Sequence, residues 1–299
     1  MSDMERHKSV YERLFGMDKD EKVEKVEKVE QVEQSELYDY YKEMMSDAHK
    51  HILIGTDSVL GTRDNQEDAV IFDCEDDRCM AVLCDGMGGL NKGEVASNTT
   101  VSTLLEDYKG TRSIENYPEF FYNEAVKIDN IVHSLTDEQG ERLECGSTMV
   151  AVAIDGDRLY WLSVGDSRIY IIRNEQIMVV NEEHNYETKL NKLLMAGQID
   201  MEIYSTEMKR GAALTSFIGI GNISLMDINN DPYILEDGDI ILLASDGLYR
   251  KVSEDIILDV LDNSGADLKL AATRLTSKAT ELTVKSQDNT TVALILYKK

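Results

Sequence analysis

Residues 81–89 read Ala-Val-Leu-Cys-Asp-Gly-Met-Gly-Gly, an apolar run that ends on an acid. A carboxylate next to buried apolar residues is unusual, because burying an unpaired charge is costly. A short apolar run that is followed by a glycine turn is typical of a strand. The segment therefore predicts a strand that delivers Asp85 to its own end.

The same arrangement recurs along the chain. Asp246 follows the apolar run 241–244, Asp166 follows 162–165, and Asp288 stands just before an apolar run at 291–297. Several acids at strand ends need a counter-charge, which hard divalent cations supply through oxygen ligands. The sequence therefore predicts a metal site at the strand ends.

Short apolar runs separated by Gly, Asp and Asn turns dominate the chain from residue 51 onward. The expected strands are 52–55, 69–73, 79–84, 148–154, 158–164, 167–173, 240–244 and 291–297. The expected helices are 93–108, 117–135, 187–196, 253–261 and 267–282. Because strands outnumber helices and several are sequential hairpins, the pattern favours an α+β sandwich over a doubly wound parallel sheet.

A set of short polar motifs follows the same order as these strands. It consists of Arg63-Asp64-Asn65-Gln66-Glu67-Asp68, Asp85-Gly86-Met87-Gly88-Gly89, Gly146-Ser147-Thr148, Val164-Gly165-Asp166-Ser167-Arg168, Leu214-Thr215, Ser245-Asp246-Gly247-Leu248 and Asp288-Asn289-Thr290-Thr291-Val292. Each motif alone is weak, since an Asp-Gly after a strand is usually a turn. The ordered set is far more specific.

This series resembles the PPM (protein phosphatase 2C-like) family, bacterial type, from about residue 55 to 297. The resemblance implies a four-layer α-β-β-α sandwich. Its two central, mostly antiparallel sheets are flanked by helices, with the metal site in the cleft between the sheets. The phosphatase domain would then span 51–299.

The resemblance also implies a set of metal ligands. Asp85 would bridge two metals, and the Gly86 carbonyl would bind one of them. Asp246 and Asp288 would hold the other, while Asp166 with Asp246 would hold a third, weaker ion. Mn²⁺ or Mg²⁺ suits such oxygen ligands.

Three further residues are expected to take part in catalysis. By this resemblance Arg63 looks like the residue that binds the substrate phosphate, a role that suits the paired N–H donors of a guanidinium group. Without the motif around it, Arg63 would be interpreted as part of a surface ion pair. Glu67 and Asp68 would act through metal-bound waters. The implied reaction is hydrolysis of phosphoserine and phosphothreonine on proteins by a metal-activated bridging water.

Two alternatives stay open at this point. One is a catalytically silent PPM-fold module that binds a partner without turnover. The other is a regulatory phosphatase that acts on one dedicated phosphoprotein. Both share the fold, and in either enzyme reading the partners are phosphorylated proteins that a serine/threonine kinase has modified.

The chain departs from the family pattern in two places. Met87 stands where eukaryotic members usually carry His, so the proton for the leaving group is expected to come from water. The flap, expected at about 186–212, lacks the usual His-Pro element, and Ser216 replaces an Arg beyond it. His184 reads as a polar loop residue rather than a catalyst.

Composition limits the class of partner and compartment. Lys and Arg total 31 against 57 Asp and Glu, a formal charge of −26, which repels a phosphate backbone and argues against nucleic acid. A polar start and short apolar runs predict a cytoplasmic protein with no signal peptide and no membrane span. Reduced cysteines and a monomer are expected.

Residues 1–50 differ in texture from the rest, with valines three apart in VEK and VEQ repeats. Valines at that spacing spiral around a helix and make no straight seam, so a coiled coil is not expected. We predict an acidic N-terminal extension that is helical or partly disordered. The stretch 37–45 is expected to form a short amphipathic helix, and the extension as a whole is a candidate adaptor for a partner.

Overall fold

The strand β3 (Arg78–Gly88) lies at the centre of the fold because both of its faces are buried. Met80, Val82 and Cys84 pack into one hydrophobic core, whereas Ala81 and Leu83 pack into a second one. Successive side chains of a strand point to opposite faces. A continuous apolar run is thus the signature of a strand between two layers, and Asp85 is placed on the face of Ala81 and Leu83.

The computed structural model describes residues 51–75, 77–88, 92–111 and 113–299, and these belong to one unit, His49–Lys299. The predicted extension at 1–50 and its short helix at 37–45 lie outside the described residues.

Within that part of the chain, β3 belongs to a sheet of order β10-β6-β5-β3-β2. Its strands are β2 (Asp68–Glu75), β3, β5 (Met149–Asp155), β6 (Arg158–Val164) and β10 (Tyr233–Ile234). The short strands β4 (Cys145–Ser147) and β9 (Asp227–Ile228) pair with β3 and β6.

A second sheet has the order β1-β12-β11-β7-β8. Its strands are β1 (Ile52–Val59), β7 (Arg168–Arg173), β8 (Gln176–Val179), β11 (Ile240–Ala244) and β12 (Thr290–Tyr297). Strand pairing in both sheets is antiparallel. Asn174 and Glu175 turn between β7 and β8 with φ of 50° and 61°, the left-handed values that a two-residue hairpin requires.

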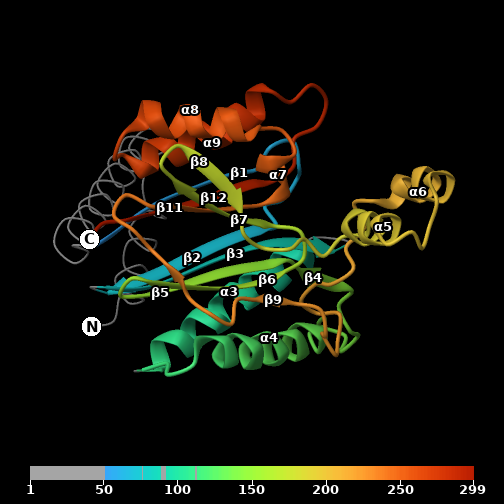
Figure 1. The fold of residues 1–299 in the computed structure, drawn as a ribbon. Helices are drawn as coiled ribbons and strands as arrows, with labels where there is room; N and C mark the ends of the chain where they lie inside the picture. The colour runs from blue at the N-terminus through green and yellow to red at the C-terminus, as the bar shows by residue number, and fades with distance from the viewer. Residues whose placement is uncertain (1–50, 76, 89–91, 112) are drawn as a thin grey trace, which may run out of the picture. The chain divides into compact units, whose positions relative to one another are not determined.

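Helices cover the outer face of each sheet (Figure 1). The helices α3 (Lys92–Gly110) and α4 (Tyr117–His133) pack on the sheet that contains β3, and α8 (Glu254–Ser264) and α9 (Leu268–Glu281) pack on the other. Side chains from both sheets form the core between them. The predicted four-layer α+β sandwich is confirmed.

A helical segment lies beside the sheets rather than on them (Figure 1). It consists of α5 (Tyr186–Met195), α6 (Met201–Glu207) and a 3₁₀ turn, η1 (Met208–Arg210). The side chains of Asn185 and Asp200 cap α5 and α6 by accepting from backbone N–H groups three residues on. The segment falls within the range where a flap is expected.

The cysteines differ from expectation in one respect. Cys79 and Cys84 lie in β3 as predicted, but Cys74 and Cys79 form a disulfide instead of two reduced thiols. The two residues face each other across β2 and β3, with Cα atoms 4.0 Å apart. Their spacing in sequence does not reveal this, because the pairing depends on where the hairpin turns.

No helix in the described residues is both long enough and apolar enough to cross a membrane.

Candidate functional site

A polar cavity of about 260 Å³ opens where the ends of β3, β11 and β12 meet. Its lining is dominated by acids and by the residues of the motifs quoted above. The lining residues are Arg63, Glu67, Asp85, Gly86, Met87, Gly88, Thr148, Asp166, Ala212, Leu214, Asp246, Arg250, Asp288 and Asn289. Both sheets contribute, so the cavity lies between them.

The buried Asp68 and the partly buried Asp85 form the floor of the acidic cluster. They are direct partners in the β2–β3 ladder, so their side chains share one face. Burial and the neighbouring carboxylates Asp68 and Asp246 raise the pKa of Asp85 well above its usual range. Burial likewise raises the pKa of Asp68 to about 7, although Ser245 donates a hydrogen bond to its Oδ2. The Oδ1 atom of Asp68 is buried without a hydrogen-bond partner.

The backbone around Asp85 is held from β4. Thr148 Oγ1 accepts from the N–H of Asp85, while Ser147 Oγ and the N–H of Thr148 donate to its carbonyl at 3.0 and 2.8 Å. Next to it Gly86 leaves no room for a side chain, since a Cβ would lie 2.2 Å from the Gly93 carbonyl oxygen. The Gly-Ser-Thr motif therefore fixes the main chain that carries the acid.

Asn289 ties the loop that carries Arg63 and Glu67 to the start of β12. Its Nδ2 donates to the carbonyls of Leu60 and Asn65, and its Oδ1 accepts from the N–H of Glu67. All three bonds span more than two hundred residues of sequence. This amide brings the N-terminal motif to the acids of the other sheet.

Two carboxylates at the rim share one arginine. Arg250 pairs with Asp246 through Nε at 2.9 Å and with Asp166 through Nη2 at 3.1 Å. Burial raises the pKa of Asp246 to about 6 and also raises the pKa of Asp166, with Arg250 opposing both shifts. Arg250 follows Asp246 by four residues, and the short helix α7 (Asp246–Tyr249) between them brings the two side chains to the same side of the helical turn.

A second arginine stands at the mouth of the cavity. Arg63 donates a 2.6 Å hydrogen bond to Asp288, and the side chains are 56% and 39% exposed. Glu67 lies deeper and accepts from the N–H of Gly93 near the start of α3. Burial raises the pKa of Glu67, which this hydrogen bond and Arg63 oppose.

The sequence-predicted residues thus come together. Arg63, Glu67, Asp85, Gly86, Asp166, Asp246 and Asp288 line the cavity, and Asp68 lies buried behind it. Among the described residues, no three His, Cys, Asp or Glu side chains form a ready-made metal-binding group. Arg63 and Arg250 hold three of the acids, so the ligand roles stay predictions. Sequence analysis missed Arg250, for which the only signal was its position four residues after Asp246.

His184 is structural, as expected. It is 2% exposed, its Nδ1 accepts from the N–H of Gly165, and its own N–H donates to the Gly165 carbonyl. Burial lowers the pKa of the imidazole. The residue fastens the loop that precedes Asp166.

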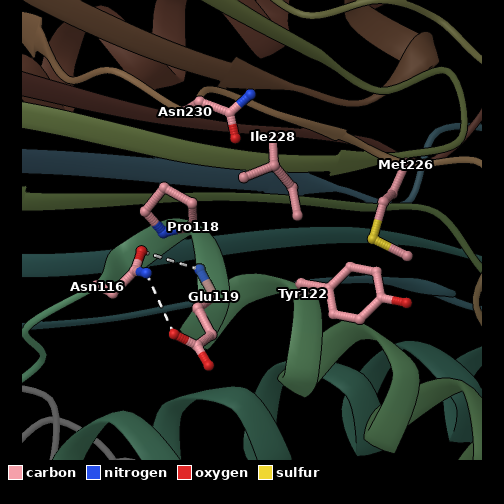
Figure 2. A pocket seen from close by; sticks show the side chains of 7 residues that line it. All are labelled: Asn116, Pro118, Glu119, Tyr122, Met226, Ile228 and Asn230. Carbon is pink, nitrogen blue, oxygen red and sulfur yellow. Dashed lines mark hydrogen bonds between the residues drawn. The ribbon is translucent and has the colours of Figure 1, made fainter.

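A larger hollow of about 700 Å³ lies at the start of α4 (Figure 2). Asn116, Glu119, Tyr122 and Met226 are among its lining residues. Asn116 caps α4 by accepting from the N–H of Glu119, and its Nδ2 donates to the Glu119 carboxylate. These polar groups satisfy each other as a helix cap, and none of the residues that line the hollow belongs to the motifs quoted above.

Comparison with known proteins agrees with this geometry. The family model described as Protein phosphatase 2C matches residues 38–190, just over half of the chain. The chain belongs to this family. The protein phosphatase PhpP of Streptococcus pneumoniae is 30% identical over 220 residues, which cover 73% of this chain and 85% of PhpP.

Solved structures of the 2C-type family have the same fold. The serine/threonine phosphatase of S. agalactiae superposes with a TM-score of 0.71 at 27% identity, covering 83% of this chain and all of that one. The catalytic domain of PstP, solved in complex with two manganese ions, gives 0.64 at 24% identity and covers 83% and 99% of the two chains. The chain is therefore a protein-serine/threonine phosphatase of the bacterial PPM type.

Proposed function

We propose that this chain hydrolyses phosphoserine and phosphothreonine on proteins in a reaction that depends on Mn²⁺ or Mg²⁺. One observation carries the proposal: acids from both sheets meet at one cavity, where Asp85 lies beside the buried Asp68 and one oxygen of Asp68 has no hydrogen-bond partner. Buried like charges are costly unless a cation offsets them. The donors are all oxygens, which suits hard divalent ions.

In this proposal Asp85, the Gly86 carbonyl, Asp246 and Asp288 hold two ions. Glu67 and Asp68 do not contact the ions directly but orient the water molecules bound to them. When bound, such ions lower the pKa of water and offset the charge on the phosphoryl oxygens. The two-manganese complex of PstP supports a pair of ions, as does the supply of ligands from two opposing sheets.

Arg63 is proposed to bind the substrate phosphate. Its guanidinium lies exposed at the mouth of the cavity and is held beside the acids by Asp288. A planar fork of N–H donors matches two phosphoryl oxygens and fixes their orientation. The described residues of the cavity wall include no histidine, so water supplies the proton for the leaving serine or threonine.

The helical segment at 186–212 is proposed as a flap that contacts the protein substrate. Ala212 at its end and Leu214 just beyond it line the cavity. Met195, Met201 and Ile203 on α5 and α6 are 90%, 61% and 47% exposed, which leaves apolar surface on this segment. Residues 1–50 are proposed as a separate extension that adapts the enzyme to a dedicated phosphoprotein.

The cellular setting follows from the chemistry. Phosphorylated side chains must be supplied by a serine/threonine kinase, so we propose that the enzyme opposes one. The formal charge of −26 argues against nucleic acid as a partner. We further propose a cytoplasmic monomer.

One observation favours the silent binding module instead. Arg63 and Arg250 pair with Asp288, Asp246 and Asp166, so three acids already have cationic partners. A module of this kind would bind phosphoprotein without releasing phosphate. The two readings therefore differ in turnover and not in fold.

The deciding experiment is phosphate release from a phosphothreonine peptide by the full-length protein with Mn²⁺, with Mg²⁺ and with EDTA. We expect release with metal, none in EDTA, and none in Asp246→Asn. Equal release in EDTA would refute the metal-dependent mechanism. Folded protein that releases no phosphate under any condition would establish the binding module.

A further inference from the structure

Arg250 occupies the place where the resemblance puts a third metal ion. That ion would lie between Asp166 and Asp246, and the guanidinium contacts both carboxylates at 3.1 and 2.9 Å. Both contacts are made to single oxygens, Oδ2 in each case. One of the two negative charges at this position is therefore already offset by the chain itself.

The arginine is held in this position by its local structure. Asp246 begins α7 and the N–H of Arg250 donates to the Asp246 carbonyl, so one helical turn brings the two side chains together. Tyr249, the residue before it, donates through its hydroxyl to the Asp166 carbonyl. The Tyr249 ring also lies under Arg168, 3.9 Å from the guanidinium carbon to the ring centroid.

Burial of Asp166 makes its ion pair with Arg250 costly to break. The Asp166 side chain is only 6% exposed, and Arg250 is 41% exposed at the cavity rim. Moving Arg250 away would leave Asp166 as a buried, unpaired charge, which is strongly unfavourable. An incoming ion at this place must both displace a cation and shed water.

We propose that Arg250 is a built-in cation that replaces the third metal ion, so that this phosphatase binds two divalent ions. The inference rests on the proposed function, since it concerns the same cavity. Arg250 acts as a positioning residue: it holds Asp246 and Asp166 in place and excludes an ion from between them.

The test is the number of Mn²⁺ ions bound by the full-length protein, measured by titration with electron paramagnetic resonance of free Mn²⁺. We expect two ions in the unmodified protein. Arg250→Asn and Arg250→Gln should each bind a third ion, with a dissociation constant on the order of 0.1–1 mM. Two variants guard against one that folds poorly, and circular dichroism checks both.

Lys251→Asn is the matched control, because Lys251 is the next residue and exposed. It loses the same charge and should bind two ions. Three ions in the unmodified protein, or two in both Arg250 variants, would overturn the inference. The proposed function fails in a different way: two ions bound, yet no phosphate released from phosphothreonine peptide.

Discussion

Asp68 and Asp85 are direct cross-strand partners in the β2–β3 ladder, and both side chains face the space between the two sheets. Like charges at such positions oppose folding. A hydrogen bond from Ser245 reduces the cost at Asp68 without removing it, since the other carboxylate oxygen has no partner. The fold therefore carries an electrostatic strain that the proposed ions relieve.

Asp85→Asn should stabilise the metal-free protein while it abolishes turnover. Because the pKa of Asp85 is raised, folding at neutral pH must either protonate this carboxyl or keep its charge beside Asp68, and the amide avoids both costs. The free energy of unfolding in EDTA should therefore rise by about 1–2 kcal/mol. Denaturant titration in EDTA measures it. Asp262→Asn, at an exposed acid on α8, is the control and should stay within about 0.5 kcal/mol. A large loss of stability in Asp85→Asn would contradict the strain argument.

Arg63→Lys should lower kcat/KM for a phosphothreonine peptide by roughly 10–100-fold, because lysine keeps the charge but loses the two-pronged contact with phosphate. Steady-state kinetics at saturating Mn²⁺ measure the change. Arg158→Lys is a matched control, as that arginine is similarly exposed and pairs with Asp155 away from the cavity. Equal kinetics in the two variants would rule out phosphate binding by Arg63.

Asp129→Ala should be among the most destabilising single changes in the domain. The Asp129 carboxylate is fully buried on α4 and accepts from the N–H groups of Gly219, Gly221 and Ile223. Leaving those donors unpaired should cost about 3–5 kcal/mol. Thermal or denaturant unfolding measures it. Asp129→Asn keeps one acceptor oxygen and should lose less stability than Asp129→Ala. A loss below about 1 kcal/mol in Asp129→Ala would contradict a stabilising role for these three hydrogen bonds.

His184→Gln should change how stability depends on pH. Burial lowers the pKa of His184 in the folded protein, so folding favours the neutral ring. Its stabilising effect is complete above the unfolded value of about 6.5 and is lost as the pH falls through the lowered folded value. The variant should therefore lose less stability than the unmodified protein between pH 7 and pH 5.

The glutamine can still accept from the Gly165 N–H, so the variant tests titration rather than the hydrogen bond. Unfolding midpoints at several pH values provide the comparison, and His51→Gln controls for removing an exposed imidazole. If the unfolding midpoints of His184→Gln and the unmodified protein depend on pH in the same way, the titration of buried His184 does not contribute to stability.

The central strands were predictable because strands that are buried on both faces have continuous apolar sequences. β12 illustrates this: Val292, Leu294 and Leu296 face the α8–α9 layer, while Ala293 and Ile295 face the other sheet. The short strands β4, β8, β9 and β10 were missed, since two to four residues carry too little periodicity. Their pairing is decided by neighbours far away in sequence.

The acids of the site were predictable for the same reason, as each follows or precedes an apolar run. What surrounds them was not. The hydrogen bond from Ser245 to Asp68 spans 177 residues of sequence. The hydrogen bond from Asn289 to the Leu60 carbonyl, before the Arg63 loop, spans more than 200. The disulfide Cys74–Cys79 and the bridge from Arg250 to Asp166 likewise depend on three-dimensional register.

The most direct test of the metal-dependent centre is one titration in which Mn²⁺ binding and phosphate release are followed in the same sample. The rate of release from a phosphothreonine peptide should rise in step with occupancy and reach a plateau when the ions are bound. Adding EDTA should abolish it, and Asp85→Asn should show neither tight binding nor release. Release that is independent of occupancy, or full occupancy without release, would contradict the account.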